Sequence, residues 1–140
     1  MKNLLVLIIA LFAFFGCGDD ESSGVNFKEF SPNEEVKLVD VSGKELTLVR
    51  KDHGFAIKND ENKVLMIDIF GTFCPPCQKE AAELTKYQLE NKDKFTLIGL
   101  THFENVTNEY VLHEFMQKFN AYYFITNDQK INDRLAEQIV

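Results

Sequence analysis

Two closely spaced cysteines carry the clearest chemistry in this chain. Cys74 and Cys77 lie in the stretch IDIFGTFCPPCQKE, separated by Pro75 and Pro76 and preceded by Asp68 within an apolar run. A pair at this spacing can serve as a redox couple, as half of a metal site or as a structural staple. Which of the three applies depends on the elements that hold the pair.

The residues around Cys74 predict that it is the more reactive cysteine. An apolar run ends at Gly71 and helical spacing begins after Cys74, so the first cysteine is expected at a helix N-terminus. Unpaired N–H groups and the helix dipole favour an anion there, which gives the sulfur thiolate character. Pro75 and Pro76 fit a first helical turn, where no N–H partner is needed. Cys77 follows one turn later, so we expect Cys74 to attack and Cys77 to resolve.

Asp68 is a further candidate catalytic residue. It interrupts an apolar run shortly before Cys74, where burying a carboxylate is costly unless the group has a use. From a buried strand beneath the helix it could accept the proton of Cys77 during exchange, with a pKa raised by desolvation. The alternative is an aspartate at a strand edge in water, and we favour the proton acceptor.

The segments before the cysteines predict three strands. Residues 36–41 (VKLVDV) and 45–49 (ELTLV) alternate apolar and polar side chains around an SGK turn, which predicts a β-hairpin. Residues 64–70 (VLMIDIF) form a nearly continuous apolar run rich in β-branched side chains. Such a run is typical of a strand buried on both faces in an α/β fold.

Helices and strands alternate after the cysteines. The signals are, in chain order, a helix after Cys74, a strand at 95–100, a helix across 111–119, a strand at 122–126 and a helix across 131–139. We interpret the apolar stripe of residues 111–119 as core rather than as a cofactor site. The order predicts an α/β fold with an N-terminal hairpin and a central, mostly parallel sheet flanked by helices.

The N-terminus has the features of an export signal. Lys2 precedes an unbroken apolar run at 4–15, and about a dozen apolar residues is too short for a membrane-spanning helix but suits a signal peptide. Gly16 before Cys17 resembles the bacterial lipobox, with Phe14 where leucine is usual. The resemblance implies that Cys17 becomes the lipidated first residue of the mature chain, whereas an ordinary signal peptide would make that cysteine incidental.

Three segments follow from this interpretation. They are a lipoprotein signal peptide at 1–16, a lipid-anchored flexible tether at 17–35 and a folded domain at 36–140. The chain has three cysteines, so lipidation of Cys17 leaves Cys74 and Cys77 alone in a protein exported to an oxidising or thiol-managed compartment. A disulfide-stapled scaffold is therefore not expected. The net charge of −7 argues against nucleic acid and anionic lipid headgroups as partners.

The stretch VLMIDIFGTFCPPCQKEAAEL resembles the thioredoxin superfamily, in particular its membrane-tethered TlpA/ResA-like branch. The matching positions are Gly71, Cys74, Pro75, Pro76, Cys77 and Glu80. Phe73 stands where tryptophan is usual, Ala82 where many members have proline, and Asp68 matches the buried acid of ordinary thioredoxins. The resemblance implies a thioredoxin-like fold and a redox-active disulfide, with an aromatic side chain beside the site. Glu80 is either a second acid near the resolving cysteine or, as we favour, a solvated helix residue.

The family pattern also includes a segment that this sequence does not match. Thioredoxin-like proteins place a cis-proline opposite the cysteine pair, followed by two strands and a helix. The prolines here are Pro32, Pro75 and Pro76. We therefore expect a truncated member of the family that lacks the cis-proline segment and the last strands. The strand at residues 64–70 would then have an open edge, which is an aggregation hazard.

Three functions compete on this sequence. The first is an extracytoplasmic thiol–disulfide oxidoreductase that needs no cofactor. The second is a module that holds Cu(I) on the two thiolates, because one such pair suits Cu(I) but not tetrahedral zinc. His53, His102 and His113 show no ligand spacing, so we predict no other metal site. The third is an inactive remnant. Only the oxidoreductase needs Asp68, and we favour it.

The resemblance also implies a direction and partners. Members of the tethered branch commonly act as reductants, for instance of apocytochrome c cysteines before haem attachment, and a membrane electron donor recharges them. We therefore expect protein thiols and disulfides as substrates, a membrane electron donor, and a lipid anchor facing the periplasm or the cell exterior.

Overall fold

The structure is a computed structural model that describes residues 27–139. Its elements are β1 (Glu35–Val39), β2 (Glu45–Lys51), β3 (Gly54–Ile57), β4 (Val64–Phe70), α2 (Pro75–Glu90), β5 (Phe95–Thr101), α3 (Asn108–Tyr110), the π-helix η1 (Val111–Phe115), α4 (Met116–Phe119), β6 (Phe124–Thr126) and α5 (Gln129–Ile139). The predicted signal peptide, Cys17 and the first part of the predicted tether lie outside the described residues.

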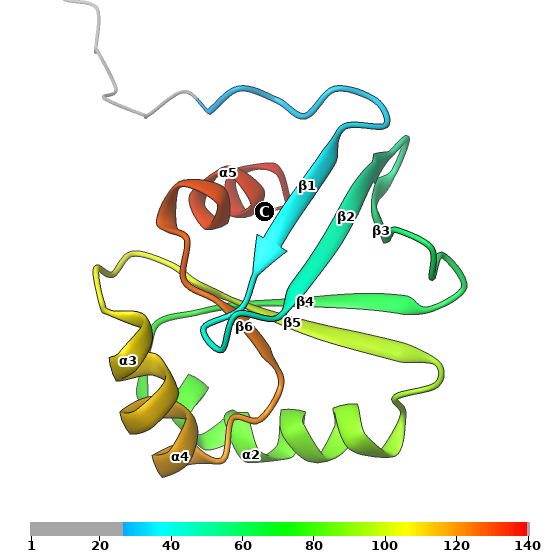
Figure 1. The fold of residues 1–140 in the computed structure, drawn as a ribbon. Helices are drawn as coiled ribbons and strands as arrows, with labels where there is room; N and C mark the ends of the chain where they lie inside the picture. Colours follow the sequence, from blue (N-terminus) through cyan, green and yellow to red (C-terminus); the bar gives the residue numbers. More distant parts are fainter. Residues whose placement is uncertain (1–26, 140) are drawn as a thin grey trace, which may run out of the picture.

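Strands β1, β2 and β3 form an antiparallel sheet in that order (Figure 1). The pairing of β1 with β2 confirms the predicted hairpin. Its turn is held by Asp40, whose Oδ1 accepts hydrogen bonds from the backbone N–H groups of Ser42 and Lys44 at 2.9 and 2.8 Å. The sequence patterns did not predict β3. It begins at Gly54, whose φ of +148° is a backbone conformation that favours glycine.

Strands β4, β5 and β6 form the parallel sheet, with β5 in the middle. Because β4 and β5 pair in parallel along their full lengths, the loops that follow them lie at the same edge of the sheet. The two sheets meet where the Val41 N–H donates to the Ile125 carbonyl at 2.9 Å and Asp40 forms a bridge with Thr126. The predicted parallel sheet and the predicted order of helices and strands after the cysteines are confirmed.

Strand β4 is less buried than its sequence predicts. Val64 is 66% exposed and Met66 is 40% exposed, so the prediction of a strand buried on both faces is wrong. The reason is the strand order, since β4 pairs with β5 and with no other strand of the described residues. Ile67 and Ile69, on the opposite face, are half-buried against the core. Within residues 27–139, β4 therefore has the open edge that we expected from the sequence.

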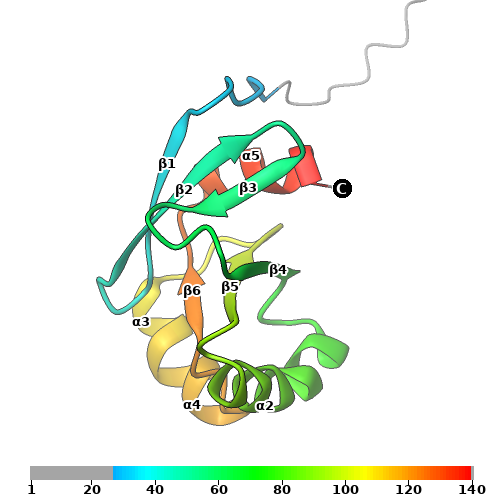
Figure 2. The same cartoon turned by 90° about the vertical axis from the view of Figure 1, so that its right-hand side faces the viewer.

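Two apolar cores lie on the two faces of the parallel sheet. Helix α2 and the α3–α4 segment cover one face, whereas α5 and the antiparallel sheet cover the other (Figures 1 and 2). Phe70 and Phe115 stack in the first core with ring centroids 5.2 Å apart. Leu100 and Leu135 are fully buried in the second core. Burial from both sides fixes the central strand β5 and, through it, the loops at its carboxyl end.

Residues 108–119 form one helical segment whose middle is the π-helix η1. Thr107 begins it, because its Oγ1 accepts a hydrogen bond from the Tyr110 N–H at 3.1 Å. Asn120 ends it with a left-handed φ of 54°. Val111 and Phe115 are 0% and 1% exposed, which confirms the prediction that this apolar stripe belongs to the core.

The described chain packs onto the fold before the expected boundary at residue 36. Phe30 is only 6% exposed, and the Arg134 guanidinium of α5 lies 3.6 Å from its ring centroid. The same guanidinium donates to the Lys28 carbonyl at 2.7 Å and to Glu34 at 2.8 Å. Residues 28–34, which we expected in the tether, thus contact the folded domain.

Candidate functional site

The cysteine pair lies where the chain passes from β4 into α2. Cys74 is the N-cap of α2, and its Sγ accepts a hydrogen bond from the Cys77 N–H at 3.4 Å. Pro75 and Pro76 occupy the first two helical positions, where a missing N–H costs no helical hydrogen bond. The two cysteines form a disulfide with their Cα atoms 5.3 Å apart. The predicted helix start and the closeness of the two sulfurs are confirmed.

The loop that carries the pair is fixed by Glu104, which lies after β5. The Glu104 carboxylate accepts a hydrogen bond from the Thr72 N–H at 3.0 Å and another from the Thr72 hydroxyl at 2.6 Å. Gln78, in α2, donates to the Thr72 carbonyl at 2.7 Å. Our sequence interpretation did not include Glu104. The parallel strand order offered a signal, because an acid just after β5 lies at the same sheet edge as the loop after β4.

Phe73 directly precedes Cys74 of the disulfide and is 66% exposed. The ring occupies the space over Gly71, since a Cβ added to Gly71 would meet the Phe73 Cε1 at 2.8 Å. Pro75 and Pro76 are also exposed. The surface around the pair is therefore apolar and accessible, as a site that contacts other polypeptides requires.

Asp68 lies on the α2 side of β4. In a strand, alternate side chains share a face, so Asp68 points to the same side as Phe70, which belongs to the core against which Cys77 packs. The Tyr123 hydroxyl donates a hydrogen bond to Asp68 Oδ2 at 3.4 Å. Asp68 is half-buried rather than enclosed, because it occupies the edge strand.

Three effects act on the ionisation of Asp68. Burial raises its pKa above the ordinary value, the hydrogen bond from Tyr123 opposes that rise, and the negative charge of Glu80 adds to it. Burial and the neighbouring carboxylate also raise the pKa of Tyr123, so its hydroxyl keeps its proton and remains a donor. Glu80 itself is exposed on α2, which agrees with the solvated helix residue that we favoured.

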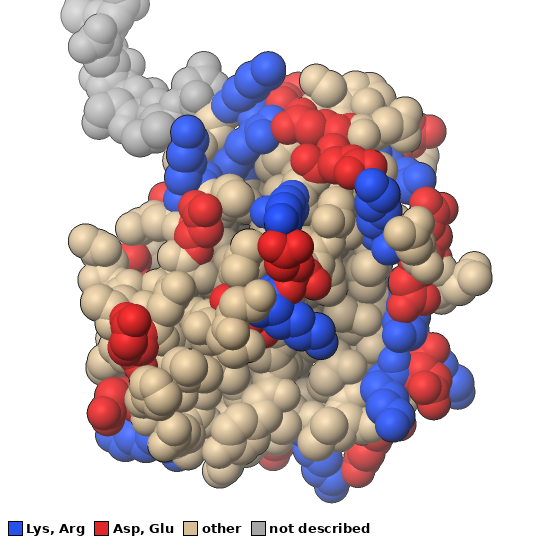
Figure 3. Space-filling view, viewed as in Figure 1, with Lys and Arg blue, Asp and Glu red and all other residues tan. Residues whose placement is uncertain are grey.

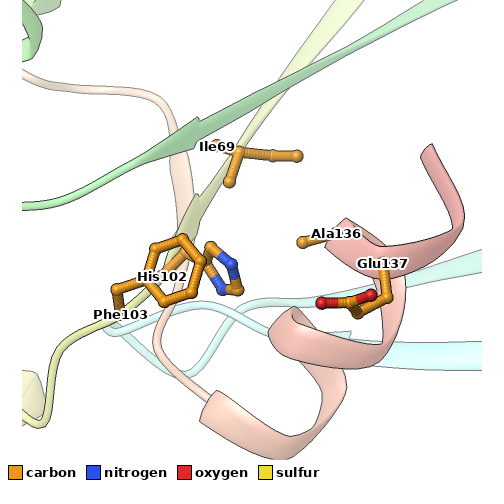
Figure 4. A pocket seen from close by; sticks show the side chains of 5 residues that line it. All are labelled: Ile69, His102, Phe103, Ala136 and Glu137. Carbon is orange, nitrogen blue, oxygen red and sulfur yellow. The ribbon is translucent and has the colours of Figure 1, made fainter. Parts of the chain in front are cut away.

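The three histidines differ in exposure and surroundings. His53 and His113 are exposed. His102 follows β5, and its Nδ1 lies 2.7 Å from Asp133 Oδ1 of α5. A pocket of about 400 Å³ opens beside it, lined by Ile69, His102, Phe103, Ala136 and Glu137, with the polar ends of His102 and Glu137 at the pocket (Figure 4). Within residues 27–139 no group of three or more potential ligand side chains is placed to hold a metal ion.

Charged side chains of both signs are interspersed over the face seen in Figure 3, especially around the antiparallel sheet. The lower middle of that face, over α4 and α2, carries fewer charges. This face therefore shows no patch of one dominant sign that would attract a polyanion.

Similar folds are found among solved structures. A secreted disulfide oxidoreductase of Mycobacterium tuberculosis, described as homologous to Escherichia coli DsbE, shares 20% identity and a TM-score of 0.51 over 71% of this chain and 66% of its own. StoA from Bacillus subtilis shares 16% identity and a TM-score of 0.54 over 77% of this chain and 74% of its own. A thiol-disulfide oxidoreductase from Bacteroides fragilis shares 16% identity and a TM-score of 0.51 over 79% and 77%.

These similarities establish that the chain has a thioredoxin-like α/β fold, as the sequence predicted. The chain spans slightly less than two thirds of the length of the Mycobacterium protein. No family model and no curated protein matches the sequence. None of the helices in residues 27–139 has the length and apolar character needed to cross a membrane.

Proposed function

We propose that this protein is an extracytoplasmic thiol–disulfide oxidoreductase that exchanges disulfides with protein substrates through Cys74 and Cys77. The observation that carries the proposal is the Cys74–Cys77 disulfide at the N-terminus of α2, within a thioredoxin-like fold. The Cys77 N–H donates to Cys74 Sγ, and a helix N-terminus favours a thiolate on a cysteine placed there, which supports reversible exchange at this disulfide.

The reaction begins with the reduced pair. The Cys74 thiolate attacks one sulfur of a substrate disulfide, and the other substrate sulfur leaves as a thiolate that takes a proton from water. Cys77 then loses its proton to the Asp68 carboxylate and attacks Cys74 Sγ. The second substrate sulfur leaves, and the Cys74–Cys77 disulfide forms. Two electrons thereby pass from the protein to its substrate, and a dithiol donor must return them.

Support for this assignment of roles comes from the contacts of each sulfur. Cys74 caps the helix and lies beside the exposed Phe73, where a substrate can reach it. Cys77 packs against the apolar core that also contains Phe70 and Tyr123, on the side of the sheet to which Asp68 points. An attacking sulfur needs access, whereas a resolving sulfur needs only its partner and a proton acceptor.

The resemblance of residues 64–84 to the tethered branch supports three narrower proposals. The protein acts as a reductant, its substrates include the cysteines of apocytochrome c, and a membrane dithiol donor recharges it. The lipobox-like sequence supports export and a lipid anchor at Cys17, facing the periplasm or the cell exterior. Fatty-acid labelling of the unchanged protein and of a Cys17→Ser variant tests the anchor, since equal labelling of the two would contradict it.

The exchange itself is tested by trapping. A Cys77→Ser variant, reduced and mixed with a disulfide-containing polypeptide, should accumulate a mixed disulfide through Cys74, because the resolving sulfur is gone. Both variants carry Cys17→Ser as well, and the matched Cys74→Ser variant should give little or no adduct, since its one remaining sulfur, that of Cys77, is packed against the core. Peptide mapping by mass spectrometry identifies the linked cysteine. An inert Cys77→Ser protein, or equal adducts from both variants, contradicts the proposal.

A further inference from the structure

Tyr123 reaches Asp68 across the central strand of the parallel sheet. Tyr123 immediately precedes β6, whereas Asp68 belongs to β4, and β5 lies between these two strands. The Tyr123 side chain is 7% exposed, and its hydroxyl donates to Asp68 Oδ2 at 3.4 Å. A buried ring must therefore pass over β5 for this hydrogen bond to form.

The ring passes at Gly99. This residue is the direct partner of Asp68 in the pairing of β4 with β5. A Cβ added to Gly99 would lie 2.9 Å from Phe70 Cε1, 3.0 Å from Tyr123 Cε2 and 3.2 Å from Ile125 Cγ1. These separations are shorter than ordinary van der Waals contact. The absence of a side chain at Gly99 thus provides the space that the tyrosine ring needs to reach the carboxylate.

Resting on the function proposed above, we propose that Tyr123 is a positioning residue for the proton acceptor of the cysteine pair, and that Gly99 gives it access. The hydroxyl holds one oxygen of Asp68 on the α2 side of the sheet. The other oxygen is left to accept the proton of Cys77 when that thiol attacks Cys74. The S–H bond of Cys77 breaks, the Cys74–Cys77 bond forms, and the proton moves to Asp68 and then to water.

The hydrogen bond also sets the pH at which Asp68 can act. The charged and titratable groups that face Asp68 are Tyr123, before β6, and Glu80, in α2. Burial and Glu80 favour the protonated carboxyl, whereas Tyr123 favours the carboxylate, which is the form that accepts a proton. Without the hydroxyl the pKa of Asp68 rises further, so a larger fraction of the protein carries a protonated, inactive acid at mildly acidic pH.

The test is the pH dependence of oxidation of the reduced pair by a disulfide-containing peptide. In Tyr123→Phe the rate should fall several-fold on the acidic side of the profile and approach that of the unchanged protein at alkaline pH. Tyr122→Phe is the matched control, because Tyr122 is adjacent but 55% exposed, and its profile should not move. In an Asp68→Asn background, Tyr123→Phe should have no further effect on the profile.

Gly99→Ala provides a second, independent variant. The added methyl group displaces the Tyr123 ring without removing its hydroxyl, so the acidic side of the profile should move in the same direction. Denaturant unfolding of each variant separates this effect from a general loss of stability, which would lower the rate at every pH.

The outcomes distinguish the inference from the function on which it rests. If the unchanged protein does not react with the peptide, the oxidoreductase proposal fails. If that protein reacts but Tyr123→Phe has an unaltered pH profile, the oxidoreductase proposal stands and the role of Tyr123 is wrong. A uniform fall in rate with no change in the shape of the profile also overturns the inference.

Discussion

Asp68 opposes the stability of the fold when it is ionised. Burial raises its pKa above the ordinary value of 3.8, with Tyr123 partly opposing that rise. Between that value and the raised pKa, the unfolded chain loses the proton before the folded protein does. Rising pH therefore lowers the free energy of unfolding through this group. The loss of stability reaches its full size only above the pKa of Asp68 in the folded protein. An ionisable side chain that lowers the stability of the fold in this way is a candidate functional residue.

The Asp68→Asn variant tests this account at the level of a single residue. Its free energy of unfolding should match that of the unchanged protein near pH 3, where the carboxyl is protonated in both states, and exceed it at neutral pH. The exchange rate at neutral pH should fall by about a hundredfold, the low end for loss of a general base. Denaturant titrations and exchange assays at both pH values provide the measurements. A variant that is less stable at neutral pH would contradict the burial argument.

Single residues differed in how far the sequence could predict them. Cys74, Cys77 and Asp68 lie within one short stretch, so their types and spacing indicated their chemistry. Tyr123 is 55 positions from Asp68, and Glu104 is 32 positions from Thr72. Tertiary packing brings these pairs together, and no local pattern marks Tyr123, whereas the position of Glu104 just after β5 offered a signal through the parallel strand order. Gly99 lies in an apolar run where glycine offers no pattern signal, and its role depends on the tyrosine ring above it.

At the scale of elements, β4 combines a reactive end with an open edge. Its carboxyl end leads to the cysteine loop, whereas its outer backbone groups have no strand partner within the described residues. Val64 and Met66 present apolar surface along this strand. An apolar, unpaired strand edge is a template for pairing with another chain.

Replacing Val64 with Lys should reduce concentration-dependent self-association, because a charge on an edge strand opposes edge-to-edge pairing. The free energy of unfolding should change by less than about 0.5 kcal/mol, since the position is exposed. Leu89→Lys is the matched control, because Leu89 is 65% exposed but lies on α2. Light scattering over a concentration series compares them. Equal effects of the two variants would mean that general surface polarity, rather than the strand edge, controls association.

The elements themselves were largely predictable from periodicity. The hairpin, the strand before the cysteines and the helix after them all follow the patterns of residues 36–90. Two predictions failed for physical reasons. The burial of β4 was overestimated because an apolar run reports the character of side chains, not the number of neighbouring strands. β3 was missed because it is short and its boundary depends on the turn at Gly54.

At the scale of the whole molecule, the beginning and the end of the described chain are joined. Arg134 of α5 contacts Glu34 and the Lys28 carbonyl, and its side chain lies over the Phe30 ring. The hydrogen bond from Arg134 holds the pKa of Glu34 below its ordinary range. Ionised Glu34 therefore stabilises the fold at pH values above the ordinary pKa of a glutamate, and this stabilisation is lost as the pH falls and Glu34 takes up a proton. Composition alone placed residues 28–34 in a tether, because such long-range contacts leave no local pattern.

The resemblance of residues 64–84 to the tethered branch leads to our central proposal, that the Cys74–Cys77 pair acts as a reductant. Its reduction potential tests that claim most directly. The measurement uses protein with Cys17→Ser, so that only Cys74 and Cys77 react, equilibrated against a thiol redox buffer. The account predicts a value near that of thioredoxin, about −270 mV. A value near that of the strong oxidant DsbA, about −120 mV, would contradict it.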